Sequence, residues 1–576
     1  MITRKILDAE SVNFLMLADS LCESPQPMPL RRTFSLMRLL KCKTICHEFA
    51  DWTRDQPCAD SVCGSHAKSC QEYIDALPLC GLTFIKKTCH TLYFFRADFS
   101  NYEEIAPLPD DSLVGFTKVH QDVIEKNGKQ IPLGYVVESY VDNPFGDQAY
   151  VMSTKKIEVE IAGRIFFLQG RYFAQQNCIT NCCAHAAIKN ALRDFYPDLT
   201  SESINSCLGI NHAARPGGKG LTLDQIQTSI QRLTGNQTWA LGSPGLSPWR
   251  FLKTIYHAIE SGLPVISLFS IPPNYHSITR GKPLSQLSRE ELDAFEASFS
   301  GKKVDGHAVT FIGHSFTAHN WWSYAFGSYF FRLKEIEYLA SLHWTDNFII
   351  QDDNFGPYYF LSTKLLTETA GARELASILP GTFSDVPIFT RDFWLKQQSY
   401  AIVTFPAEMA FIKDCLDVEP WAIVTLNASV EFLKIEISQG RLPGPSGESF
   451  SHYFEKYFRD NSLILRTFIL SKKDYIEDTG ANHPEMISDF RDIFEKILPD
   501  YFWLTEISIP ELFWINKRKI GEIITHPQYF SVKQSEGVIL MKIPEYLMLS
   551  LDRVYAYPVK ESSLHYPLSK ARVPFT

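Results

Sequence analysis

Cys182 stands six residues after Gln176, at the start of a segment with an apolar stripe. If this segment is a helix, the positive end of its dipole favours the thiolate form of Cys182. The side-chain amide of Gln176, one short loop upstream, can donate a hydrogen bond to the oxyanion that forms when a thiolate attacks a carbonyl. The spacing therefore predicts a cysteine nucleophile with an oxyanion donor, although a cysteine buried at a helix start has the same local pattern.

A nucleophilic cysteine needs a base, and the base needs a group that orients it. His307 follows Gly306 at the head of a predicted strand, between small residues that can leave it facing a cleft. Farther along, another predicted strand ends in Asp352, Asp353 and Asn354. A carboxylate at a strand end can orient an imidazole, although the same residues are common in solvent-exposed turns.

The elements that carry these residues show clear periodicity. Apolar residues after the cysteine recur at helical spacing, which predicts a helix with one buried face; they are Ala184, Ala187, Ile188, Ala191, Leu192 and Phe195. Further helices are predicted to begin at Thr222 and Pro248. Runs of β-branched and aromatic residues predict strands, including those at 265–269, 308–312, 347–351 and 401–405.

This ordered set resembles the papain-like cysteine peptidase superfamily over about residues 170–365. The motifs are Gln-x5-Cys on a helix, Gly-His-Ala-Val at the head of a strand, and strand-Asp-x3-Gly. The layout is most similar to double-glycine-leader peptidases and related bacterial papain-fold domains. The resemblance implies an α+β fold, with the cysteine on a helix and the histidine and aspartate on an antiparallel sheet.

The resemblance also implies a role for each residue. Gln176 and the backbone N–H of Cys182 would be the oxyanion donors, and Cys182 the nucleophile. His307 would take the thiol proton and return it to the leaving amine. Asp352 would hold the imidazole tautomer and stabilise its cation.

Two positions have neighbouring alternatives. With Cys183 as nucleophile, the following Ala-His-Ala-Ala-Ile matches some relatives better, but the spacing from the glutamine becomes seven residues, so Cys182 is favoured. Asp353 stands where relatives often have proline, which favours Asp352 as the orienting acid. Asn354 is the third choice, because many papain relatives use asparagine.

Composition limits the classes of function. The 576 residues are 45% hydrophobic and 21% charged, as in globular proteins of about two to four domains. The net charge of −9 argues against broad nucleic-acid binding. No apolar run reaches the ~18 residues of a membrane span. The acidic residues near Met1 do not fit a secretory signal, and 13 irregularly spaced cysteines do not suggest disulfides. We expect a cytoplasmic protein.

The pattern along the chain predicts four regions. These are a helical N-terminal region at 1–80, a β-rich region at 81–169, the papain-like domain at 170–397 and a C-terminal α+β domain at 398–576. A polar insertion at about 271–305 interrupts the papain-like region. We expect no cofactor, because the sequence contains neither a phosphate-binding glycine loop nor a His-Glu-x-x-His motif.

Two cysteine–histidine groups could bind zinc, but neither has the tight paired spacing of a strong zinc motif, and no metal is expected. They are Cys42-x3-Cys46-His47 and Cys58-x4-Cys63-x2-His66-x3-Cys70.

Three functions remain open. The leading hypothesis is a cysteine peptidase that hydrolyses a peptide or isopeptide bond of a protein or peptide substrate through a thioester acyl-enzyme. The second is an acyltransferase, of the transglutaminase or deamidase type, because such enzymes use the same residue types in the same chain order. The third is a non-catalytic protein-binding module.

Overall fold

The computed structural model describes most of the chain and divides it into two compact units. The first unit comprises Met1–Gly245, Pro264–Gly313 and Phe348–Thr404, and the second comprises Leu246–Leu263, His314–Asn347 and Phe405–Thr576. The described residues are 2–22, 27–53, 73–146, 149–152, 156–177, 179–211, 220–242, 248–271, 288, 290, 305–315, 331–333, 336–363, 400–409, 418–442, 463–482, 484–513, 517–526, 537–550, 554–559 and 566–569. Most of the polar insertion and the cysteine–histidine group at 58–70 lie outside them.

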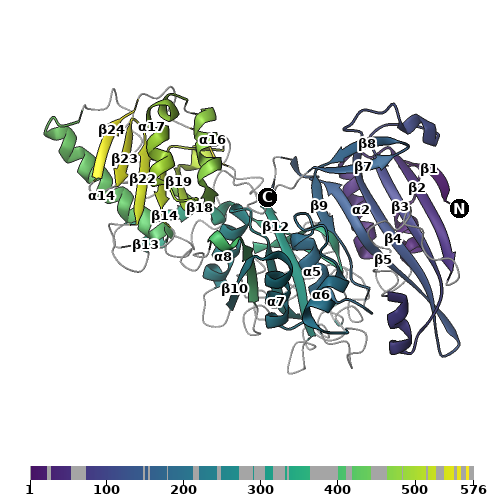
Figure 1. Cartoon of the computed structure of the whole chain (residues 1–576). Coiled ribbons are helices and arrows are strands. Elements are labelled where there is room, and N and C mark those ends of the chain that lie inside the picture. The colour runs from purple at the N-terminus through teal and green to yellow at the C-terminus, as the bar shows by residue number, and fades with distance from the viewer. Residues whose placement is uncertain are drawn as a thin grey trace. The chain divides into compact units, whose positions relative to one another are not determined.

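The N-terminal part of the first unit is an antiparallel sheet in the order β1-β2-β3-β4-β5-β9 (Figure 1). Two helices, α1 (Phe14–Leu21) and α2 (Met28–Leu39), accompany it, and α2 packs against β5. The strands are β1 (Thr3–Asp8), β2 (Thr44–Thr53), β3 (Thr83–Phe95), β4 (Leu113–Lys126), β5 (Lys129–Asp142) and β9 (Gly170–Phe173).

The prediction that residues 1–80 are helical is therefore wrong for two segments. Strands β1 and β2 lie within this range, and β2 pairs along its whole length with β3, from Thr44 opposite Phe95 to Thr53 opposite Lys86. The partner strand is distant in sequence, so local apolar periodicity did not reveal the pairing.

The residues Ala162-Gly163-Arg164 predict a hairpin turn that leads into a strand at 165–168, and a hairpin is present there. Strands β7 (Ile157–Ile161) and β8 (Arg164–Leu168) form an antiparallel pair. The two residues between them, Ala162 and Gly163, both have positive φ, at 53° and 73°. Positive φ at both central positions defines a type I′ turn, whose twist matches that of the flanking strands.

A second sheet in the first unit carries the histidine and the aspartate. Its order is β10-β17-β11-β12-β15-β16, with β6 beside β12. Strand β17, which the sequence places in the C-terminal region, pairs instead with β11, so the expected boundary at 397/398 does not separate two sheets. The strands are β6 (Ala149–Val151), β10 (Gln237–Gly242), β11 (Val265–Ile271), β12 (Asp305–Ser315), β15 (Asn347–Asp352), β16 (Gly356–Ser362) and β17 (Tyr400–Phe405).

Helix α5 (Cys183–Leu192) covers this sheet with α6 (Ser201–Leu208) and α7 (Leu223–Thr234), and the three helices gather beside β12 (Figure 1). The apolar stripe from Ala184 to Leu192 is buried, as predicted from its spacing, but Phe195 lies beyond the end of α5 and is half-buried. Thr222 caps α7 by accepting a hydrogen bond from the backbone N–H of Gln225 at 3.2 Å. The shared core contains Ala184, Ala187, Ile188, Ala191, Ile266, Ala308 and Ile402.

The second unit is built on an eight-stranded sheet with helices on both faces. Neighbouring residues of one strand, Ile523 and Ile524, belong to different cores, because successive side chains point to opposite faces. The sheet runs in the order β13 (Phe331–Leu333), β14 (Ile336–Ala340), β18 (Ile464–Ser471), β19 (Tyr501–Ser508), β21 (Gly521–Thr525), β22 (Val538–Ile543), β23 (Tyr546–Ser550) and β24 (Val554–Pro558). The remaining elements are α8 (Pro248–Glu260), α14 (Val418–Ser438), α16 (Lys472–Asn482), α17 (Pro484–Ile497), α18 (Pro510–Phe513), β20 (Arg518–Lys519) and β25 (Tyr566–Pro567).

The fold class is thus α+β, with several sheets and mixed helices and strands in both units. Among the described helices, none combines the length and the apolar character that crossing a lipid bilayer requires.

Candidate active site

His307 and Asp352 lie on neighbouring strands of the second sheet and form a direct pair. His307 is the third residue of β12, and Asp352 is the last residue of β15. The Nε2 atom of His307 lies 3.1 Å and 3.2 Å from the two carboxylate oxygens of Asp352. Both side chains are almost completely buried, with 4% and 1% of their surface exposed. A carboxylate in this position orients the imidazole and stabilises its cation.

The two alternative orienting residues, Asp353 and Asn354, lie farther from the imidazole of His307. Oδ1 of Asp353 lies 3.8 Å from Nε2 of His307. The amide Nδ2 of Asn354 is 3.4 Å from the same nitrogen. The backbone N–H of Asn354 donates to Oδ1 of Asp352 at 2.8 Å, which holds that carboxylate toward the ring. Of the three candidates, Asp352 has the shortest contacts with His307.

Burial and charge act in opposite directions on His307. Burial disfavours the charged ring, but the nearby carboxylate of Asp352 overcomes this effect and raises the pKa of His307 to about 9. Burial raises the pKa of Asp353 to about 7, against the influence of the His307 cation. At neutral pH, His307 is therefore an imidazolium.

The two adjacent cysteines differ in their surroundings. Cys182 is the N-cap of α5, has 8% of its surface exposed and contributes to the apolar core. Its charge is among the influences that raise the pKa of His307. Cys183 is partly exposed, and its Sγ lies 3.8 Å from the carbonyl oxygen of Gly306. A hydrogen bond with Cys182 and burial raise the pKa of Cys183 well above its ordinary value, so Cys183 stays protonated.

Gln176 lies half-buried in the loop between β9 and α5. Its neighbour Gln175 has a structural role, because its Oε1 accepts a hydrogen bond from the backbone N–H of Val136 at 3.1 Å. The loop is held by Asn177, whose Oδ1 accepts hydrogen bonds from three backbone N–H groups at 3.0–3.2 Å; the donors are Ile179, Thr180 and Asn181.

The expected role of the Cys182 backbone N–H needs correction. This group donates to Nδ1 of His185 at 3.3 Å, so it is engaged within the first turn of the helix rather than pointing to a substrate. The reason is local, since residues three apart face each other across a helical turn. Gln176 is the other oxyanion donor expected from the sequence, and its role stays a prediction.

His185 and Asn205 belong to the site although the sequence did not single them out. Nδ1 of His185 lies 3.3 Å from Sγ of Cys182, and Nε2 of His185 lies 3.0 Å from Oδ1 of Asn205. The available signal was the Cys-x2-His spacing at a helix start, which brings the two side chains together.

Two groups of residues in the described part of the chain have side chains of the types that bind metal ions. Ligand atoms of His307, Asp352 and Asp353 lie within 4.8 Å of one another. However, Nε2 of His307 is already used by Asp352, so the pair does not need an ion. The zinc candidate Cys42, Cys46 and His47 does not converge, because Cys46 and His47 point to opposite faces of β2 and His47 bonds to His90.

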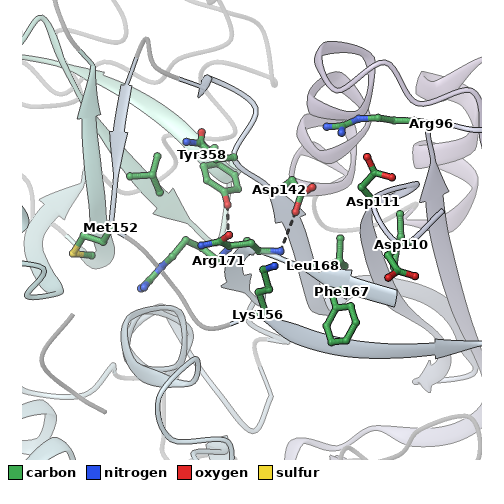
Figure 2. Close-up of a pocket in the computed structure, with 15 residues that line it drawn as sticks. Arg96, Asp110, Asp111, Asp142, Met152, Lys156, Phe167, Leu168, Arg171 and Tyr358 are labelled. Atoms are coloured by element: carbon green, nitrogen blue, oxygen red, sulfur yellow. Dashed lines mark hydrogen bonds between the residues drawn. The ribbon is translucent and has the colours of Figure 1, made fainter. Parts of the chain in front are cut away.

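A pocket of about 710 Å³ lies elsewhere in the first unit (Figure 2). None of the residues discussed so far as catalytic lines it. Its wall includes a buried backbone contact, in which the N–H of Arg171 donates to the hydroxyl of Tyr358 at 3.0 Å. Charged residues of both signs also line the pocket, namely Arg96, Asp110, Asp111, Asp142 and Lys156.

Comparisons of this chain with protein-family models, curated proteins and solved structures found no match.

Proposed function

We propose that this chain is a papain-like cysteine peptidase that hydrolyses a peptide or isopeptide bond through a thioester acyl-enzyme. The observation that carries the proposal is the buried His307–Asp352 pair, with Nε2 at 3.1 Å and 3.2 Å from the carboxylate. Nε2 faces the carboxylate, and in the proposed reaction Nδ1 is the ring nitrogen that exchanges protons with a thiol, a leaving amine or water.

The charge states support this chemistry. A pKa of about 9 keeps His307 protonated at neutral pH, which is the state that stabilises a neighbouring thiolate. The raised pKa of Cys183 disfavours it as a thiolate at neutral pH, which favours Cys182 as the nucleophile. Its position at the N-terminus of α5 adds the favourable helix dipole.

In the proposed reaction, the thiolate of Cys182 attacks the carbonyl carbon and the amide of Gln176 stabilises the oxyanion. His307 donates its proton to the leaving amine, and the carbon–nitrogen bond breaks. Neutral His307 then takes a proton from water as the water oxygen attacks the thioester carbon. The carbon–sulfur bond breaks, the acyl group leaves as a carboxylic acid, and the Cys182 thiolate and the His307 imidazolium are restored. Asp352 holds the ring throughout.

Acylation by p-nitrophenyl acetate tests the proposal directly. We expect a burst of nitrophenolate and an acetyl thioester on Cys182, located by mass spectrometry, in the wild-type chain and not in Cys182→Ala. Cys207→Ala is the matched control. Cys207 is also a free cysteine of the first unit, and it is partly exposed whereas Cys182 is buried. An acetyl group on Cys183, retained in Cys182→Ala and lost in Cys183→Ala, would move the nucleophile by one residue.

The same assay separates hydrolysis from acyl transfer. Acetate released at an equal rate with and without glycinamide supports the peptidase. An N-acetyl product that grows with the amine concentration would instead identify an acyltransferase. A chain that shows no cysteine-dependent burst would contradict both enzymatic functions.

A further inference from the structure

A second histidine contacts the proposed nucleophile. His185 is completely buried on α5, one turn from Cys182. Its Nδ1 lies 3.3 Å from Sγ of Cys182, and its Nε2 lies 3.0 Å from Oδ1 of Asn205. Three side chains thus form a continuous Cys–His–Asn array that does not include His307.

The hydrogen bonds around Asn205 determine which nitrogen of His185 carries the proton. The amide Nδ2 of Asn205 donates to the carbonyl oxygen of Thr180 at 3.0 Å, so its Oδ1 faces the imidazole. An amide oxygen only accepts hydrogen bonds, and Nε2 of His185 must therefore be the donor. Nδ1 is then an acceptor, in agreement with the Cys182 N–H that points to it at 3.3 Å.

We propose that His185 is a second base for Cys182 and that Asn205 is its positioning residue. The thiol proton moves from Sγ of Cys182 to Nδ1 of His185, which ends the hydrogen bond that the Cys182 N–H donates to Nδ1 and leaves a thiolate and an imidazolium whose Nε2–H is held by Asn205. No net charge is created. The inference rests on the proposed function, because it assigns the ionisation of the same nucleophile.

This arrangement divides the acid–base work between two histidines. His185 ionises the thiol, and the His307–Asp352 pair serves the leaving group and the water of deacylation. A capping box brings the two residues together, since the Cys182 side chain accepts from the backbone N–H of His185 and the His185 side chain accepts from the Cys182 N–H. The cap places Nδ1 of His185 at Sγ of Cys182, and the bond to Asn205 lies outside the cap. Several titratable groups interact electrostatically with Cys182. They include Cys183 at the start of α5, His307 on β12 and Asp353 after β15.

Alkylation by iodoacetamide between pH 5 and 9, resolved by residue with mass spectrometry on the full chain, tests the assignment. We expect His185→Gln to slow alkylation of Cys182 at pH 6.5 by about tenfold or more, because an ordinary thiol with a pKa of about 8.5 is only ~1% ionised there. Asn205→Ala should slow it less. His307→Gln should lose steady-state turnover, and because it also removes a cation that stabilises the thiolate it should slow alkylation, but by less than His185→Gln.

Asn181→Ala is the matched control for the loop. Asn181 is also a buried amide, but its Nδ2 donates to Oγ of Ser201 at 3.1 Å and its Oδ1 accepts from the backbone N–H of Asn177 at 2.6 Å, so both ends of the amide bond to groups other than the His185 ring. Its alkylation profile should match that of the wild type. Profiles of His185→Gln and Asn205→Ala that overlay the wild type, or an equal loss in Asn181→Ala, would overturn the inference.

Folding of each variant is checked by circular dichroism and thermal unfolding. If His185→Gln does not fold, Asn205→Ala and Asn205→Ser decide, because both leave the imidazole in place. The two proposals fail in different ways. Turnover that requires Cys182 and His307 with alkylation independent of His185 rejects the inference alone, whereas alkylation that depends on His185 without any acyl-enzyme rejects the proposed function.

Discussion

At the scale of single residues, the carboxyl groups beside His307 are not equivalent. Asp352 contacts Nε2 at 3.1 Å and is held in place by the backbone of Asn354, whereas Asp353 approaches to 3.8 Å. Burial also raises the pKa of Asp353 to about 7, which disfavours its charged form. The imidazolium of His307 therefore depends mainly on one partner.

Substitution of this partner should change both the charge and the chemistry. We expect Asp352→Asn to lower the pKa of His307 from about 9 by about one to three units, because an opposite charge within reach shifts a pKa by that amount. Steady-state turnover of p-nitrophenyl acetate should fall by about 100- to 10,000-fold. Histidine NMR titration and kinetics measure the two effects.

The neighbouring acid provides the control for this prediction. Asp353→Asn should cause a smaller pKa change and a smaller loss of turnover, because its carboxylate is farther from the ring. A larger effect at Asp353 than at Asp352 would show that the orienting acid had been assigned to the wrong residue.

At the scale of elements, the turn after β15 determines where the Asp352 carboxylate lies. The carbonyl oxygen of Asp352 accepts a hydrogen bond from the N–H of Phe355 at 3.1 Å, which closes the turn into β16. Gly356 follows with φ at +110°, a conformation that side chains rarely adopt. The glycine of the Asp-x3-Gly motif is thus a requirement of the backbone that carries the acid.

Gly356→Ala should therefore destabilise the first unit. A Cβ at this position would lie 2.8 Å from Cβ of Arg32 and 3.0 Å from Cα of Pro29, in addition to the backbone strain. We expect the free energy of unfolding to fall by at least about 1–3 kcal/mol, measured by urea denaturation. Gly209→Ala, at φ +62° with open space around it, carries the backbone cost alone and should lose less. Equal losses would contradict the steric argument.

At the scale of the whole molecule, the two units use charge differently. The proposed catalytic residues all belong to the first unit, which is assembled from three separate stretches of chain. In the second unit, Arg466 is buried between two carboxylates, 2.5 Å from Glu260 and 2.6 Å from Glu506. Lys519 extends this network, 2.8 Å from Glu506. Such a network stabilises the fold only while its charges remain paired.

Removal of the central cation should expose this dependence. Arg466→Met leaves the Glu260 carboxylate buried, and we expect the second unit to lose about 3–5 kcal/mol of stability. Denaturation followed by hydrogen exchange of β18 and β19 would measure the loss. Arg441→Ala removes an arginine from an exposed pair with Glu436 and should leave stability within experimental scatter. An equally mild effect at Arg466 would show that the buried pairing contributes little.

Sequence alone was enough to predict several of the local elements, although not strands β1 and β2. The apolar spacing after Cys182 predicted α5, Thr222 predicted the start of α7, and the residues around Gly163 predicted the β7–β8 hairpin. These features depend on side-chain periodicity, capping and turn chemistry, all of which act between residues a few positions apart. The chain order of the candidate cysteine, histidine and acid was also readable at this level.

Only the tertiary structure decided which groups meet. The pairing of β2 with β3 and the place of β17 beside β11 depend on partners far along the chain. Asp352 and Asp353 differ in their distances to His307, and these distances depend on how the strands pack. The contact of His185 with Cys182 and Asn205 depends on how the helices pack. Sequence determined the residue types that could do chemistry, and long-range packing determined their geometry, because side-chain distances are set by contacts that periodicity does not encode.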